Sequence, residues 1–91
     1  MNRETLQSVL RAAGAQQEKN GPFRAASEQR LTFYIGDGRL AIAQVEEVRL
    51  EESFVVLHAK ELGQLFADYA SVYAVSSQPP KESAPKKAGF A

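Results

Sequence analysis

The sequence has no cysteine, no tryptophan and a single histidine, His58. Without cysteine it has no disulfides, no thiolate chemistry and no sulfur-ligated zinc site. One histidine also excludes a metal site built on several histidines of one copy. No apolar run approaches the roughly 20 residues of a membrane helix, and no apolar stretch typical of a secretory signal follows Met1. We therefore expect a cytoplasmic protein with no metal, no cofactor and no membrane contact.

Net charge is also missing, because 11 basic residues balance 11 acidic ones. A neutral chain has no overall field to attract nucleic acid. A length of 91 residues, 44% of them hydrophobic, predicts one small domain. The charges are uneven: residues 22–75 carry five basic and eight acidic groups, whereas both flanking segments are net positive. Most large apolar residues lie in this acidic middle segment, which is therefore the predicted folded domain.

The C-terminal segment 77–91 has little to bury, since Phe90 is its one large apolar side chain among prolines and lysines. Such a composition does not offset the entropy of ordering the chain. We predict a disordered tail whose lysines either contact phosphates or aid solubility.

The N-terminal segment has helical periodicity over residues 3–13. Asn2 is a suitable N-cap and Gly14 a natural stop. The apolar positions follow the i, i+3, i+4, i+7 spacing of an amphipathic helix: Leu6, Val9, Leu10 and Ala13. A polar linker follows, so residues 1–21 are predicted as a helical extension and linker. Pro22 then predicts a second, short helix that continues to Gln29, since proline suits the first helical position.

From residue 31 the period changes to two, which is typical of strands. The predicted strands cover residues 31–35, 40–50, 54–57, 64–69 and 71–75, and Gly36-Asp37-Gly38 forms the first turn. The phase of the long strand slips after Val45, which predicts a bulge near Glu46-Glu47. Because no helix separates the strands, we expect antiparallel pairing and a small barrel or sandwich.

Four segments within residues 22–76 resemble a known family. They are Pro22-Phe23 opening a segment that ends in Arg30, the strand and turn from Leu31 to Gly38, Ser53-Phe54-Val55-Val56-Leu57, and Gln64 to Ala70. Their order is similar to the Sm-like small barrel, in particular the family of the bacterial RNA chaperone Hfq. The resemblance implies a mainly β fold, with N-terminal helix or helices before a five-stranded, strongly bent antiparallel (SH3-like) barrel.

The chain departs from that family where the family binds RNA. A Tyr-Lys-His stretch of the family corresponds to Ala67, Asp68 and Tyr69 here, so that an anion replaces a cation. The glycine at which the second strand of the family bends corresponds to Ala43, and the glutamine before Phe54 is Ser53. The fold therefore carries over better than the RNA site.

The resemblance implies a post-transcriptional riboregulator or RNA chaperone that binds single-stranded A- or U-rich RNA. The implied RNA-binding residues are Phe54, Ser53, Tyr69, Arg24 and Arg30. Phe54 would stack a base, although a phenylalanine at such a position is more often core. Tyr69 would stack a base or reach a neighbouring subunit, or simply end a strand with a solvated hydroxyl. The two arginines contact phosphates or belong to a solvated helix face.

No catalytic residue emerges from the sequence. His58 has no Asp or second His nearby in sequence, and adjacent carboxylates such as Glu46 and Glu47 point to opposite faces of a strand. We therefore expect a non-enzyme. The alternative to RNA binding is an Sm-fold scaffold for protein interactions, which the acidic middle segment favours.

The last two predicted strands are short and apolar on both faces. An isolated small barrel would leave their edges unpaired, and the family closes a ring by pairing such edges between subunits. The resemblance therefore implies a homohexameric ring, with an interface that contains Leu65, Phe66, Val72, Tyr73 and Val75.

Overall fold

The computed structural model describes residues 1–19, 21–26 and 29–78. It is mainly β with one N-terminal helix. The elements are α1 (Arg3–Ala12), β1 (Gln16–Gln17), β2 (Phe23–Arg24), β3 (Arg30–Ile35), β4 (Leu40–Leu50), β5 (Phe54–Ala59), β6 (Gly63–Asp68), the 3-10 turn η1 (Tyr69–Ser71) and β7 (Val72–Gln78).

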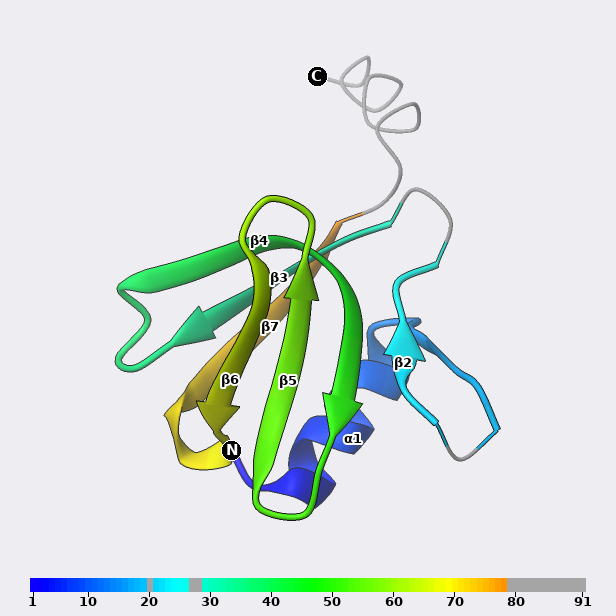
Figure 1. Ribbon diagram of the computed structural model, residues 1–91, viewed down its shortest axis with the longest axis horizontal. Coiled ribbons are helices and arrows are strands. Elements are labelled where there is room, and N and C mark those ends of the chain that lie inside the picture. Colours follow the sequence, from blue (N-terminus) through cyan, green and yellow to red (C-terminus); the bar gives the residue numbers. More distant parts are fainter. Residues whose placement is uncertain (20, 27–28, 79–91) are drawn as a thin grey trace, which may run out of the picture.

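The strands form one strongly curled antiparallel sheet, a half-barrel (Figure 1). Its five longer strands have the spatial order β6–β5–β4–β3–β7. The long β4 joins the two halves: its first part pairs with β3, and its second part pairs with β5 on one side and β2 on the other. Sharing one bent strand between the two halves curls the sheet around its apolar face.

The bend in β4 lies at Gln44. This residue has a φ of 54°, and it is the one non-glycine residue with a positive φ in the described part of the chain. The register of β4 shifts here against both neighbours. In the pairing with β3 the shift lies between Leu31 and Phe33 of β3, and in the pairing with β5 it lies between Val45 and Glu47 of β4. The bulge predicted near Glu46-Glu47 is confirmed. It increases the local twist and so allows an 11-residue strand to bend.

Helix α1 is part of the same core as the strands. The side chain of Asn2 accepts a hydrogen bond from the backbone N–H of Thr5 at 2.8 Å, and Gly14 follows the helix with a φ of 91°, as the sequence predicted. Leu6 and Leu10 are fully buried. In Figure 1 the helix lies behind β5 and the second half of β4. It thereby covers apolar surface that the curled sheet would otherwise expose.

The core is continuous from α1 to β7. Its members are Leu6, Leu10, Phe23, Leu31, Phe33, Ile42, Val45, Val48, Val55, Leu57, Ala59, Tyr69 and Val72. These residues come from both termini of the described chain and from every longer strand except β6. Leu65 and Ala67 of β6 pack against this cluster from its periphery.

The second helix predicted from Pro22 to Gln29 is wrong in its described part. Phe23 and Arg24 form strand β2 and pair with Val48 and Glu47 of β4. Residues 25 and 26 are not helical, and residues 27 and 28 lie outside the described part. Because so short a helix is marginal by itself, burying Phe23 to 1% exposure in the sheet outweighs the local preference.

Two further boundaries differ from the sequence prediction. The polar linker contains strand β1, which pairs with β2 through Gln16 and Gln17. Strand β7 continues to Gln78, and therefore enters the segment predicted as tail; residues 79–91 lie outside the described part. No helix in the described residues is long and apolar enough to cross a membrane.

Candidate interaction surface

The row of five longer strands ends in β6 and β7, each of which has an unpaired edge. Among the described residues β6 pairs only with β5, and β7 pairs only with β3. The two strands are of similar length, Gly63–Asp68 and Val72–Gln78, and η1 connects them directly. Unpaired strand edges offer a row of backbone donors and acceptors to another strand. These two edges are therefore the most obvious places for association.

An apolar patch lies beside the β6 edge, on the outer face of β5 and β6. Val56 pairs in register with Phe66, and Phe54 with Asp68, so these residues share one face. The rings of Phe54 and Phe66 have centroids 6.2 Å apart and are tilted by 47°. Phe54 is 40% exposed and Phe66 is 65% exposed, whereas Val56 is buried without belonging to the main core. We call Phe54, Val56 and Phe66 the outer aromatic patch.

The five residues predicted for the oligomer interface divide into two groups. Phe66 on β6 and Tyr73 on β7 are about two-thirds exposed, at 65% and 64%. Val72 is buried in the core, and Leu65 and Val75 are partly buried against it. The side chain of Val72 is therefore occupied within its own subunit. Of the five predicted residues, Phe66 and Tyr73 are the two whose side chains are exposed enough to contact another molecule.

Tyr69 is buried at the start of η1. Its hydroxyl donates a hydrogen bond to the carbonyl oxygen of Glu51 at 2.5 Å. Burial raises the pKa of the Tyr69 hydroxyl above its ordinary value of 10.0, and the nearby Arg3 guanidinium opposes this rise. At 7% exposure the ring of Tyr69 packs in the core and ties η1 to the end of β4. It offers little face to a base.

Ion pairing uses several of the cations on this surface. The Nε of Arg24 lies 2.6 Å from Glu18 Oε2, and the Nε of Arg49 lies 3.0 Å from Glu51 Oε2. Arg49 lies opposite Val56, next to the outer aromatic patch. The turn from Glu51 to Ser53 and the end of β6 add further carboxylates, Glu52 and Asp68, both exposed. The end of the sheet that carries Ser53 and Phe54 is therefore not a basic surface.

Arg24 and Arg30, predicted on one basic helix, lie on two different strands. Arg24 is on β2 and pairs in register with Glu47. Arg30 begins β3, pairs in register with Gln78 and is half-buried. Phe54 is the first residue of β5, and the β5–β6 turn follows the last residue of that strand. Arg30 lines a hollow together with Glu61 of this turn, so Arg30 and Phe54 lie at opposite ends of the sheet. The structure therefore does not bring Phe54 and Arg30 into one site.

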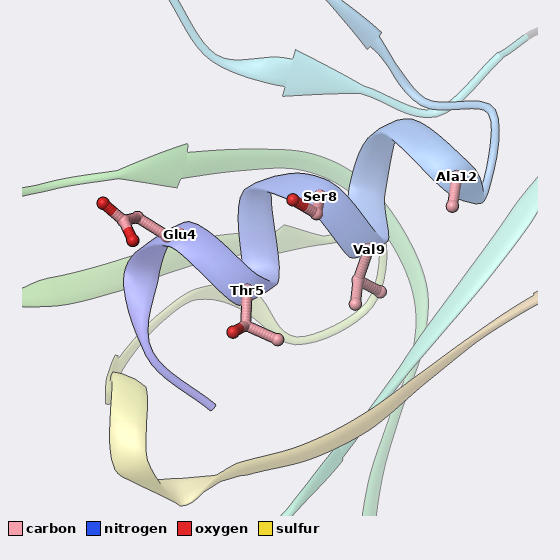
Figure 2. Close-up of a pocket in the computed structure, with 5 residues that line it drawn as sticks. All are labelled: Glu4, Thr5, Ser8, Val9 and Ala12. Atoms are coloured by element: carbon pink, nitrogen blue, oxygen red, sulfur yellow. The ribbon is translucent and has the colours of Figure 1, made fainter.

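The outer side of α1 carries a shallow hollow of about 430 Å³. All five lining residues come from this one helix, as Figure 2 shows: Glu4, Thr5, Ser8, Val9 and Ala12. A hollow without a wall from a second element does not enclose a ligand. The described residues also contain no group of three or more His, Asp or Glu side chains that could hold a metal ion.

No family model, no curated protein and no solved structure matches this chain.

The sequence indicated Phe54 and Phe66 separately and missed that they form one patch. Residues 54–57 are an uninterrupted apolar run, which does not reveal the face toward which each side chain points. The structure separates the two faces: Val55, Leu57 and Ala59 belong to the core, whereas Phe54, Val56 and His58 lie on the outer face, where Phe54 and His58 are exposed and Val56 is covered. The interpretation of Phe54 as a core residue is wrong, because its side chain lies on the outer face of the sheet and is 40% exposed.

Proposed function

We propose that this protein is a self-associating β scaffold with an Sm-like architecture, whose subunits join through the free edges of β6 and β7. The observation that carries the proposal is the coincidence of unpaired strands with exposed aromatic side chains. Phe66 accompanies the β6 edge and Tyr73 accompanies the β7 edge. Leaving an apolar strand edge in water favours aggregation, and pairing each β6 with the β7 of a neighbour removes both edges.

A head-to-tail contact of this kind closes at a fixed number of subunits. The strand order, with β6 and β7 at opposite ends of the row of longer strands, supports a ring, and the resemblance to the Hfq family supports six subunits. The expected mass in light scattering is then about six times the 10.0 kDa of one chain. A mass of one subunit at micromolar concentration would contradict the proposal.

Two exposed apolar residues allow a matched mutational test. Phe66→Glu places a charge beside the β6 edge, whereas Leu40→Glu places one at the start of β4, at a side chain of similar exposure, 56% against 65%. Phe66→Glu should reduce the mass to that of smaller species, because the new carboxylate on the outer face of β6 would have to be desolvated against the neighbouring subunit. Leu40→Glu should keep the assembly intact. Equal effects of the two substitutions would remove the β6 edge from the contact.

RNA binding is a second candidate, and the exposure of Phe54 supports it. An exposed aromatic ring can stack any base, and Phe54 lies beside Ser53 at the end of the sheet where the Hfq resemblance implies RNA contact. The pairing of Arg49 with Glu51 and the exposed carboxylates nearby leave few cations for phosphates, which is why we place this function second.

Fluorescence anisotropy with labelled A-rich and U-rich single strands distinguishes the two functions. RNA binding predicts micromolar or weaker affinity with a shallow salt dependence, and loss of that affinity in Phe54→Ala. The scaffold alone predicts no binding at low salt by an intact oligomer. An absorbance ratio at 260 and 280 nm that shows no nucleic acid in the purified protein would agree with the scaffold.

A further inference from the structure

A second hollow lies at the end of the sheet that is remote from Phe54. It has a volume of about 340 Å³, which is in the range of small-molecule sites. Unlike the hollow on α1, it takes its walls from several elements: the start of β3, the bend of β4, the β5–β6 turn and the end of β7. The lining residues are Arg30, Thr32, Ala43, Gln44, Glu61 and Gln78. We call it the Arg30 cleft.

The cleft contains one cation and one anion that do not neutralise each other. Arg30 and Glu61 both line it, yet they form no ion pair with each other. The other polar lining groups are the hydroxyl of Thr32 and the amides of Gln44 and Gln78. Two opposite charges that face one space without meeting suit a ligand that carries both signs itself.

The side chain of Arg30 has a shielded polar atom without a partner. Its Nε is shielded from solvent and has no hydrogen-bond partner in the structure. Among the described residues, no protein acceptor takes up its other guanidinium N–H groups either. An N–H group withdrawn from water without an acceptor carries a free-energy cost. Arg30 is half-buried as a residue, and the planar guanidinium offers a fork of N–H donors that suits the binding of a carboxylate.

Gln44 is held at the cleft by an unfavourable backbone conformation. Its φ of 54° lies in the left-handed region that glycine and asparagine tolerate better. Its carbonyl oxygen accepts a hydrogen bond from the N–H of Lys60 at 3.0 Å, which fixes the bend to the turn that bears Glu61. Strained residues of this kind concentrate at functional sites.

We propose that the Arg30 cleft binds a small zwitterion of the amino-acid type, with its carboxylate on Arg30 and its ammonium group on Glu61. Thr32, Gln44 and Gln78 supply the uncharged hydrogen-bonding groups. The proposal does not depend on self-association or on RNA, because the cleft lies within one chain and away from the outer aromatic patch.

The test is an NMR titration of the isotope-labelled full chain with glycine and with glycylglycine, two zwitterions of different charge separation. Acetate and methylammonium serve as probes that carry one charge each. At least one zwitterion should shift the amide signals of Arg30, Gln44 and Glu61 in a saturable manner, with a weaker response to either single-charge probe. The absence of saturable shifts with both zwitterions would overturn the proposal.

Two charge-removing variants locate the contacts. Arg30→Gln and Glu61→Gln should each weaken zwitterion binding by about tenfold, since each removes a charge-assisted hydrogen bond. Glu61 is exposed on a turn, so its variant keeps the fold even if Arg30→Gln does not. Arg39→Gln is the control, because Arg39 is exposed and lies beside Asp37, away from the cleft lining. Acetate binding as tightly as the zwitterions, unchanged in Glu61→Gln, would refute the role of Glu61.

Discussion

Single residues decide how this small sheet curls and how its ends are attached. Gln44 allows β4 to bend, and Tyr69 ties η1 to the end of β4. Neither residue belongs to a recognisable motif. Each acts through one feature of geometry, a left-handed backbone in one case and a buried hydroxyl in the other.

The bend at Gln44 leads to a prediction about stability. Gln44→Gly should increase the free energy of unfolding by up to about 1.5 kcal/mol, because the relief of left-handed strain, about 1–2 kcal/mol, offsets the entropic cost of glycine, about 0.5–1 kcal/mol. Urea unfolding measures the change. Ala43→Gly is the matched control: Ala43 has no positive φ, so this substitution should be destabilising. If the Arg30 cleft binds a zwitterion, the more stable Gln44→Gly protein should bind it less tightly.

Tyr69 leads to a prediction about alkaline pH. Tyr69→Phe loses the hydrogen bond to Glu51 and should lower the free energy of unfolding by about 1 kcal/mol near neutral pH. Burial raises the pKa of Tyr69 in the folded protein above its ordinary value of 10.0. The stability that neutral Tyr69 contributes to the folded protein is therefore fully present below pH 10.0, and it is lost as the pH rises through the pKa of the folded protein.

Unfolding by urea at neutral pH and above pH 10.0 checks this prediction. The difference in stability between the wild type and Tyr69→Phe should shrink at the higher pH. Tyr73→Phe is the control, because Tyr73 is an exposed tyrosine in the next strand; its difference from the wild type should stay small at both values. If the difference in free energy of unfolding between the wild type and Tyr69→Phe is the same at both pH values, ionisation of the Tyr69 hydroxyl does not destabilise the fold.

At the scale of elements, α1 behaves as a structural part of the barrel. An amphipathic helix in front of a sheet can be a detachable extension or a lid on the core. Here Leu6 and Leu10 are members of the core, and the amino group of Met1 donates hydrogen bonds to the carbonyl oxygens of Tyr69 and Val72 at 3.0 and 2.7 Å. These contacts connect the first element with the last one.

We therefore expect Leu6→Ala to lower the free energy of unfolding by about 2–5 kcal/mol, the cost of a cavity at a fully buried leucine. Ser8→Ala, two residues further on the exposed side of the same helix, should change it by less than about 0.5 kcal/mol. Chemical denaturation of both variants gives the comparison. Similar small effects would mean that α1 can leave the sheet without loss of stability.

At the scale of the whole molecule, hydrogen bonds of Ser77 tie the end of β7 to the N-terminal part of the domain. Ser77 accepts a hydrogen bond from Gln29 Nε2 at 2.6 Å and donates one to the carbonyl oxygen of Ala13 at 3.2 Å. Gln29 itself donates to the same carbonyl of Ala13 at 2.6 Å. Ser77 thus links the end of α1, the start of β3 and β7.

Two truncations test how much these hydrogen bonds and the following segment contribute to stability. Deleting residues 79–91 should leave the melting temperature nearly unchanged, since this segment is poor in apolar side chains. Deleting residues 77–91 should lower the free energy of unfolding by about 1–2 kcal/mol, because it also removes the bonds of Ser77. A clear loss of stability in the shorter truncation would mean that the tail docks on the domain, with Phe90 as its one large apolar side chain.

The sequence alone determined the features that depend on neighbouring residues. The helix with its Asn2 cap and Gly14 stop, the turn at Gly36 to Gly38 and the approximate positions of the five longer strands follow from local periodicity and from the conformational freedom of glycine. The slip in phase near Glu46-Glu47 also revealed the bulge, because a strand that curls must change the face it presents. These patterns need no partner from elsewhere in the chain.

Only the tertiary structure decided what depends on distant partners. The burial of Phe23 against Val48 made β2 a strand where local preference indicated a helix. The pairing of β5 with β6 turned Phe54 outward beside Phe66, and the curl of β4 brought Arg30 and Glu61 to one cleft. In each case the deciding free energy comes from contacts between residues far apart in sequence, which local periodicity does not encode.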